Sequence, residues 1–127
     1  MNNFDRAYTF IYYKDMKKAS AFYRDLLGLE EEVESSWTTL YKVTSDYSIG
    51  VVQDGEGHLR ATEDKPVIIC LGLNDNANIL DLYQKMEDGG VKMQTSKVEL
   101  RDIEGRIFFC EDPEGYTVEI VQRPKSS

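Results

Sequence analysis

The chain's 127 residues, of which 41% are hydrophobic, suffice for one sizeable core but not for two, so we expect a single domain over residues 1–127. Its formal net charge of −8 argues against nucleic acid as a partner, because phosphate contacts need clustered lysine and arginine. No stretch has the apolar length of a signal peptide or a membrane span, and we therefore expect a cytoplasmic protein that does not contact a membrane.

The first half of the chain begins with an apolar, aromatic strand predicted over residues 8–13. Asp15 then provides a helix N-cap, apolar residues recur at helical spacing as far as Leu27, and Gly28 ends the helix. β-Branched and aromatic residues predict three further strands, at 29–33, 37–43 and 47–53. The charged, glycine-containing stretch 54–64 indicates a linker.

The second half repeats this order. A strand is predicted at 67–73, Asp75 is the second N-cap candidate, and a helical apolar face ends at Gly89. Three strands should follow, near 92–98, 106–111 and 116–122. The tetrapeptide 112–115, Asp-Pro-Glu-Gly, fits a type I turn between the last two strands.

An internal repeat accounts for this organisation. A shift of sixty positions places Asp15 on Asp75, and a shift of sixty-nine aligns residues 46–53 with residues 115–122. The economical interpretation is a repeated βαβββ unit, because each unit exposes an apolar sheet face that a second unit can cover. We expect the modules at about 6–53 and 65–123, with coincidental similarity between amphipathic segments as the alternative.

Two motifs carry a resemblance to a known family. Residues 13–15, Tyr-Lys-Asp, followed by residues 21–29, Ala-Phe-Tyr-Arg-Asp-Leu-Leu-Gly-Leu, resemble the opening strand and helix end of the vicinal oxygen chelate superfamily, which includes glyoxalases, bleomycin-resistance proteins and extradiol dioxygenases. Residues 109–119, with Phe first, Asp-Pro-Glu-Gly inside and Glu last, are similar to its closing signature. The resemblance implies an α+β fold whose two modules form an eight-stranded, cup-shaped mixed sheet, with helices outside and a small-molecule cavity inside. It also implies a homodimer.

The resemblance also locates four positions that hold the metal in metal-dependent relatives, and here they are Tyr8, Gly50, Ile68 and Glu119. Only Glu119 carries a typical ligand. A transition-metal site of this kind needs three or four converging nitrogen or oxygen donors. We therefore expect no cofactor, and the alternative is a divalent metal in an atypical shell.

Strand alternation selects the residues that would face the cup. Glu119 lies opposite its apolar neighbours Val118 and Ile120, so it could accept a proton or bind a cationic or hydroxylated ligand; the alternative is a relic paired with a nearby cation or phenol. Trp37 and Tyr41 are expected on one face. The predicted site consists of Glu119 as the catalytic candidate and of the ligand-binding residues Tyr8, Phe10, Tyr12, Trp37, Tyr41, Gly50, Ile68 and Cys70. Aromatic walls with few polar anchors suit a planar or apolar ligand, although the rings could instead simply fill the cup.

The remaining polar candidates are given weaker roles. Cys70 and Cys110 lie in apolar runs, which predicts buried, reduced thiols. Arg106 is a candidate for an anionic ligand, but an arginine at a strand start is more often solvated or at an interface, and we assign it no catalytic role. His58 and Arg60 are expected to be solvent-exposed, with ligand contact as the alternative, within a linker that could cover the mouth of the cup.

Three functions remain open at this point. The leading hypothesis is a metal-independent small-molecule binder that resembles the bleomycin-resistance branch. The alternative is a lyase, isomerase or dioxygenase similar to lactoylglutathione lyase, which would use an atypical metal shell or Glu119 alone. The third is a protein-interaction module with a filled cup.

Overall fold

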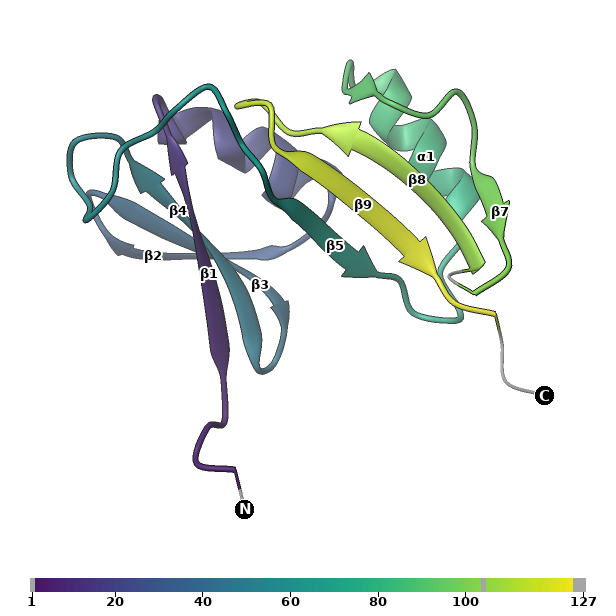
Figure 1. The fold of residues 1–127 in the computed structure, drawn as a ribbon, viewed down its shortest axis with the longest axis horizontal. Coiled ribbons are helices and arrows are strands. Elements are labelled where there is room, and N and C mark those ends of the chain that lie inside the picture. Colours follow the sequence, from purple (N-terminus) through teal and green to yellow (C-terminus); the bar gives the residue numbers. More distant parts are fainter. Residues whose placement is uncertain (1, 104, 125–127) are drawn as a thin grey trace. The chain divides into compact units, whose positions relative to one another are not determined.

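The computed structural model describes residues 2–103 and 105–124, which fall into two compact units, Met1–Glu63 and Asp64–Ser127 (Figure 1). The boundary lies at the end of the predicted linker. The N-terminal unit contains β1 (Ala7–Tyr13), η1 (Met16–Lys18), η2 (Ala21–Leu26), β2 (Glu30–Ser35), β3 (Thr38–Thr44) and β4 (Tyr47–Gln53). The C-terminal unit contains β5 (Ile68–Gly72), α1 (Ile79–Asp88), β6 (Lys92–Met93), β7 (Glu99–Arg101), β8 (Gly105–Glu111) and β9 (Thr117–Gln122).

Each unit builds its own mixed sheet. In the N-terminal unit the order is β1-β4-β3-β2, with β1 parallel to β4 and the other pairs antiparallel. In the C-terminal unit the order is β5-β9-β8-β6, with β5 parallel to β9 and with β7 also paired to β8. The predicted α+β fold of two βαβββ modules is confirmed. The predicted strand near 92–98 is instead divided into the two-residue β6 and the later β7.

The first helical segment keeps its predicted ends but not its predicted form. The Asp15 carboxylate accepts a hydrogen bond from the Lys17 amide at 3.1 Å, and Gly28 adopts a φ of 75°, so the cap and the stop are confirmed. Between them the chain forms a 3-10 turn and then a π-helix, in which the Leu27 amide reaches back five residues to the Phe22 carbonyl. Such widened turns are rare and are often found at functional sites.

The second helix begins later than predicted. Its N-cap is Asn78, whose side-chain oxygen accepts from the amides of Leu80 at 3.0 Å and Asp81 at 3.3 Å. The prediction that Asp75 is the cap is wrong, because a hydrogen-bonded turn from Asn74 to Ala77 lies between β5 and the helix and contains Asp75. Asparagine and aspartate cap equally well, so local propensity did not distinguish the two positions.

Two glutamines repeat the same contact in both units. The Gln53 side chain, at the end of β4, donates from Nε2 to the Lys14 carbonyl at 2.6 Å, in the connection between β1 and η1. The Gln122 side chain, at the end of β9, donates to the Asn74 carbonyl at 2.8 Å, in the connection between β5 and α1. These are the residues paired by the shift of sixty-nine. The internal repeat therefore extends to individual hydrogen bonds.

The turn over residues 112–115 is confirmed as well. The Gly115 amide donates to the Asp112 carbonyl at 3.0 Å, and Gly115 has a φ of 90°, a conformation that glycine adopts without steric cost. The buried Asp112 carboxylate accepts from the amides of Glu114 and Tyr116, both at 2.9 Å. This turn sets the hairpin that joins β8 to β9.

One face of each sheet packs against the helical segment of its own unit. In the N-terminal unit Tyr41 lies 5.4 Å from Tyr23 of η2, measured between ring centroids. In the C-terminal unit the rings of Tyr83, on α1, and Phe108, on β8, meet edge to face at 5.2 Å. We call the opposite side of each sheet its open face, and the predicted site residues on the strands are judged by whether they lie there.

Candidate functional site

The open face of the N-terminal sheet carries a row of aromatic side chains on β1. Tyr8 is 46% exposed and Phe10 is 48% exposed, whereas Ile11 and Tyr13, which alternate with them, are buried. The Tyr8 and Phe10 rings stack with centroids 6.3 Å apart. The prediction that Tyr8, Phe10 and Tyr12 share a face is therefore confirmed. The pairing of β1 with β4 is continuous, without a register shift.

Gly50 lies opposite Phe10 in the parallel pair of β1 and β4, and the Phe10 ring covers it. A Cβ atom at position 50 would be 2.5 Å from Cδ1 of Phe10 and 3.1 Å from Leu40. No larger residue fits there unless the ring moves. Gly50 thus lies beneath the Phe10 ring and offers no side chain to a ligand.

The predicted linker 54–64 is an ordered loop over its first part. The Asp54 carboxylate accepts from Nε of Arg60 at 2.7 Å and from the Ala61 amide at 3.0 Å, which closes the loop on itself. The Arg60 guanidinium, whose hydrogen bond is the largest cause, lowers the pKa of Asp54 to about 2. The Leu59 amide donates to the Tyr12 hydroxyl at 3.1 Å, so the loop also attaches to β1.

Gly57 marks the closest approach of this loop to the sheet. A Cβ atom there would be 2.6 Å from Val52 and 2.9 Å from the Tyr12 ring. This contact buries Val52, which is 1% exposed although it lies on the open face. Glycine at 57 is therefore what lets the loop lie directly on the aromatic row.

The loop and the aromatic row border an open pocket of about 360 Å³, which is lined by Phe10, Tyr12, Trp37, Val52, Glu56, Gly57 and His58. Three of these residues, Phe10, Tyr12 and Trp37, belong to the predicted site. Glu56, Gly57 and His58 were missed, because a charged segment with two glycines indicates a loop but not where that loop packs. His58, expected to be solvent-exposed with ligand contact as the alternative, is exposed and also lines this pocket.

The prediction that Trp37 and Tyr41 share a face is wrong. Tyr41 is 1% exposed and packs against Tyr23 on the helix-covered side, whereas Trp37 is 39% exposed and lines the pocket. Trp37 precedes β3, in the turn that follows the bulge of β2, so strand alternation does not extend to it. Burial, followed by the hydrogen bond with the Glu31 carboxylate, raises the pKa of Tyr41.

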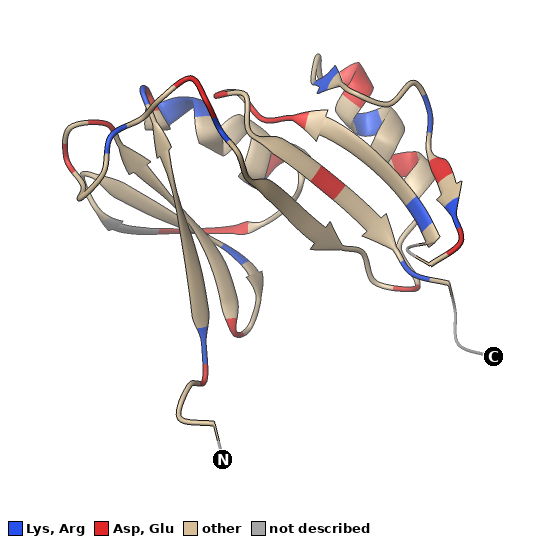
Figure 2. Ribbon diagram, viewed as in Figure 1, with Lys and Arg blue, Asp and Glu red and all other residues tan. Residues whose placement is uncertain are grey.

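The open face of the C-terminal sheet carries the other predicted residues. Glu119 lies midway along β9, where Figure 2 shows an acidic residue within the strand, and it pairs with Cys70 of β5. Val118 and Ile120, on either side of it, are buried, so its predicted orientation is confirmed. Ile68 is 54% exposed on the same face. Ile68, Cys70 and Glu119 therefore form one patch on this sheet.

The two thiols differ from each other. Cys110 is buried as predicted, and burial raises its pKa to about 12. Cys70 is exposed, so its predicted burial is wrong, since alternation along β5 turns it to the open face with Ile68. Partial burial, and then the charge and hydrogen bond of Glu119, raise the pKa of Cys70. Neither thiol is in a setting that favours the thiolate.

Two of the four metal-ligand positions have no side-chain donor. In the N-terminal unit, Gly50 has no side chain and its space is taken by the Phe10 ring. In the C-terminal unit, Ile68 carries no donor. Within residues 2–103 and 105–124, no group of three or more histidine, cysteine, aspartate and glutamate side chains is arranged to hold a metal ion. A single carboxylate and a phenol are too few donors for a zinc, nickel or iron centre of this kind.

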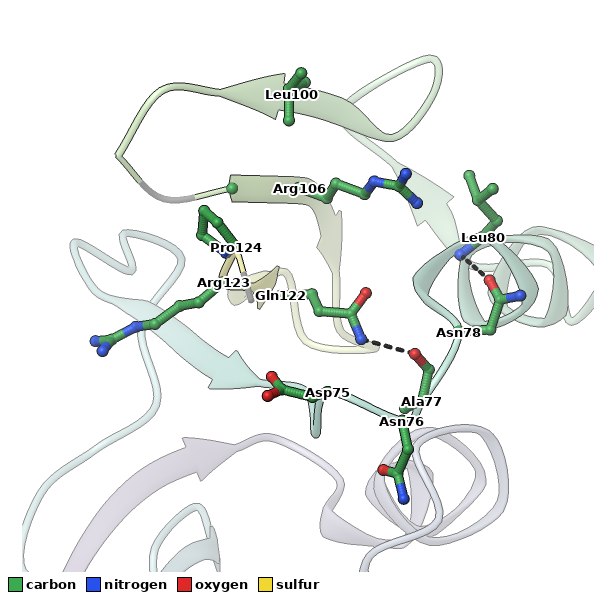
Figure 3. A pocket seen from close by; sticks show the side chains of 11 residues that line it. Asp75, Asn76, Ala77, Asn78, Leu80, Leu100, Arg106, Gln122, Arg123 and Pro124 are labelled. Atoms are coloured by element: carbon green, nitrogen blue, oxygen red, sulfur yellow. Dashed lines mark hydrogen bonds between the residues drawn. The ribbon is translucent and has the colours of Figure 1, made fainter. Parts of the chain in front are cut away.

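A second pocket lies in the C-terminal unit, where the start of β8 and the end of β9 approach the start of α1 (Figure 3). It measures about 590 Å³ and is lined by Asp75, Asn76, Ala77, Asn78, Leu80, Leu100, Gly105, Arg106, Gln122, Arg123 and Pro124. Arg106 extends toward Leu80, and Arg123 points away from the other labelled side chains. The Gln122 amide already holds the Asn74 and Ala77 carbonyls. This pocket is larger than the aromatic one, but its polar groups do not converge.

Comparisons with known proteins agree with this fold. The family model described as Glyoxalase/Bleomycin resistance protein/Dioxygenase superfamily matches residues 6–120. Among solved structures, a lactoylglutathione lyase from Agrobacterium tumefaciens is similar with a TM-score of 0.69 at 19% identity, over 91% of this chain and 90% of that one. The oxidase ChaP-H2 is similar with a TM-score of 0.73 at 20% identity, over 99% and 98% of the two chains.

A third similar structure is a glyoxalase/bleomycin resistance protein/dioxygenase from Alicyclobacillus acidocaldarius, with a TM-score of 0.70 at 17% identity over 95% and 92% of the two chains. No curated protein matches the chain. None of the helices in the described part of the chain is long and apolar enough to cross a membrane. The family match spans most of the sequence, and the chain belongs to the glyoxalase/bleomycin resistance protein/dioxygenase superfamily.

Proposed function

We propose that this protein binds a small organic molecule without the help of a metal, in the pocket walled by Phe10, Tyr12 and Trp37. The observation that carries the proposal is the convergence of two rings of β1, Phe10 and Tyr12, with Trp37 from the turn before β3, beneath a loop that is hydrogen-bonded to Tyr12. Ligand sites are typically concave, mostly apolar and equipped with a few polar groups. Here Glu56 and His58 supply the polar groups.

The surrounding contacts support a formed site. The loop is held at both ends of its turn, by the Asp54 carboxylate and by the Tyr12 hydroxyl, so the pocket exists before a ligand arrives. Preformed pockets avoid the entropic cost of ordering a loop on binding. The exposed parts of Phe10 and Trp37, 48% and 39%, are the apolar surface that a ligand would cover.

Trp37 gives the proposal a direct test, because it is the only tryptophan in the chain. We would screen aromatic and cationic compounds by thermal shift and titrate each hit while recording the fluorescence of Trp37. A true ligand both raises the melting temperature, through preferential binding to the folded state, and changes this fluorescence. In Trp37→Leu, which lacks this fluorescence, thermal shift should show an affinity about tenfold weaker, the equivalent of one lost aromatic contact.

Phe4→Leu is the matched control, since Phe4 is 81% exposed and does not line the pocket. It should leave both signals unchanged. A screen in which no compound shifts the melting temperature, or one in which the hits bind Trp37→Leu as tightly as the unmodified protein, would count against the proposal.

An enzymatic function is the second candidate, and Glu119 is the residue that favours it. Its carboxylate is half-buried on the open face of the C-terminal sheet, and its neighbour across the strands is Cys70. Such a carboxylate could take a proton from a bound substrate. If the protein turns over a hemithioacetal or a catechol, Glu119→Gln should abolish the activity while leaving the fluorescence of Trp37 unchanged.

The proposal includes a homodimer, which the family resemblance supports. Light scattering on the purified protein tests it. A mass equal to one chain at micromolar concentration would oppose this part of the proposal and leave the pocket itself untouched.

A further inference from the structure

The lining of the aromatic pocket carries an acidic side chain. It contains the Glu56 carboxylate and no lysine or arginine. The nearest cation in the same loop, Arg60, is held by both oxygens of Asp54, at 2.7 and 3.2 Å. Within the part of the chain that the structure describes, the Glu56 carboxylate makes no ion pair. The pocket therefore offers a negative charge whose partner is not supplied by the described residues.

The aromatic walls of the pocket also favour a cation. The faces of aromatic rings carry a negative electrostatic potential and attract cations, tryptophan most strongly. Phe10 and Trp37 keep 48% and 39% of their surface exposed, so their rings are accessible from the pocket. Three rings beside a carboxylate form the arrangement that binds ammonium groups whose charge is spread over methyl or aromatic carbon.

We infer that the ligand of this pocket is an organic cation, with a quaternary ammonium or similarly delocalised charge on an apolar body. This inference rests on the proposed function and names its ligand class. An anion would face the Glu56 carboxylate with no lysine or arginine in the lining to offset its charge, and a neutral aromatic would leave the carboxylate unused. A compact, strongly hydrated cation would gain little from the rings. The net charge of −8 adds a weaker attraction at long range.

The test compares two compounds of the same shape, 3-hydroxyphenyltrimethylammonium and 3-tert-butylphenol, by the fluorescence of Trp37 and by thermal shift. The ammonium compound should bind about tenfold more tightly than the phenol, because it alone gains cation–π and charge attraction. Its affinity should also fall as salt is added, whereas that of the phenol should not.

Two variants locate the effect. Glu56→Gln should reduce the preference for the ammonium compound over the phenol, because only the cation–π attraction remains, and Glu63→Gln, in the same loop but outside the lining, should leave the preference unchanged. Glu56 is exposed, so neither change should disturb folding, and circular dichroism checks this.

The outcomes distinguish the cationic ligand class from the proposed small-molecule binding itself. Equal affinity for the two compounds, or an undiminished preference in Glu56→Gln, would overturn the cationic ligand class and keep a small-molecule pocket. Failure of both compounds to bind, together with a screen that yields no ligand, would overturn the pocket as well.

Discussion

The ring of Phe10 lies over the backbone of Gly50, so closely that a Cβ atom at position 50 would be 2.5 Å from Cδ1 of Phe10. The two residues are partners across the parallel strands β1 and β4. Gly50 occupies one of the positions that the family resemblance assigns to a metal ligand. In this chain, the space that a ligand side chain would need belongs to an aromatic ring that walls the proposed pocket.

Gly50→Ala tests this relationship. The new methyl group must displace the Phe10 ring, which is half-exposed and can move, so we expect a loss of about 1 kcal/mol in unfolding free energy. Affinity for a pocket ligand should also fall, because the Phe10 ring that forms one wall of the pocket has moved. Urea unfolding and Trp37 titration measure the two effects. Unchanged affinity would mean that Phe10 does not shape the pocket.

Metal should make no difference to this protein. Because the positions at Gly50 and Ile68 lack donors, dialysis against a chelator should leave the melting temperature unchanged, and added zinc, nickel or manganese should not raise it. Elemental analysis of the purified protein is the complementary measurement. One bound transition metal per chain would contradict the prediction.

Asp54→Asn should loosen the pocket loop. The variant removes the charge that holds Arg60, so Glu56 and His58 should lose their fixed places and ligand affinity should fall several-fold. Asp46→Asn, in the exposed turn between β3 and β4, is the control. Faster hydrogen exchange at the Ala61 amide, which donates to Asp54, would report the loosening directly.

The same contact predicts a dependence on pH. The pKa of Asp54 is lowered in the folded protein to about 2, from roughly 3.9 in an unfolded chain. Its stabilising contribution is therefore fully present above about pH 4 and is lost as the pH falls toward 2. The loop should accordingly stay closed at neutral pH and open in acid. In Asp54→Asn, hydrogen exchange of the loop amides should no longer show this acid-induced opening.

Glu119→Gln should make Cys70 more reactive. The negative charge of Glu119 is one cause of the raised pKa of Cys70, so its removal increases the thiolate fraction at a given pH. We expect alkylation of one thiol per folded chain, at Cys70, because Cys110 is buried, and we expect the rate to rise in the variant. Glu87→Gln, on α1, should have no effect. An unchanged rate in Glu119→Gln would show that the two side chains do not interact.

Tyr41→Ala distinguishes the core from the site. Tyr41 is 1% exposed and contacts Tyr23, so its truncation should cost about 3 kcal/mol in unfolding free energy, as for other buried aromatic residues. Ligand affinity of the folded variant should be nearly unchanged, the reverse of the result expected for Trp37→Leu. An equal loss of affinity in Tyr41→Ala and Trp37→Leu would mean that Tyr41 contributes to the ligand site.

The sequence by itself determined most of the strands and which way most of their side chains face. The strand predicted over residues 47–53 is the observed β4, and the alternation of Tyr8, Phe10 and Tyr12 on β1 holds residue for residue. A strand has a period of two, so a few consecutive residues reveal its faces. The shift that aligns Gln53 with Gln122 also anticipated a contact that both units share.

Tertiary structure alone decided which way residues outside the strands face and on what the loops pack. Trp37 follows a bulge, so no alternation rule fixed its face, and the choice of Asn78 over Asp75 as a cap depended on the turn before α1. The loop that carries Glu56 and His58 packs on Tyr12, a residue more than forty positions earlier in the sequence. Such a contact depends on the folded sheet being present, and for that reason the pocket could not be found from local sequence patterns.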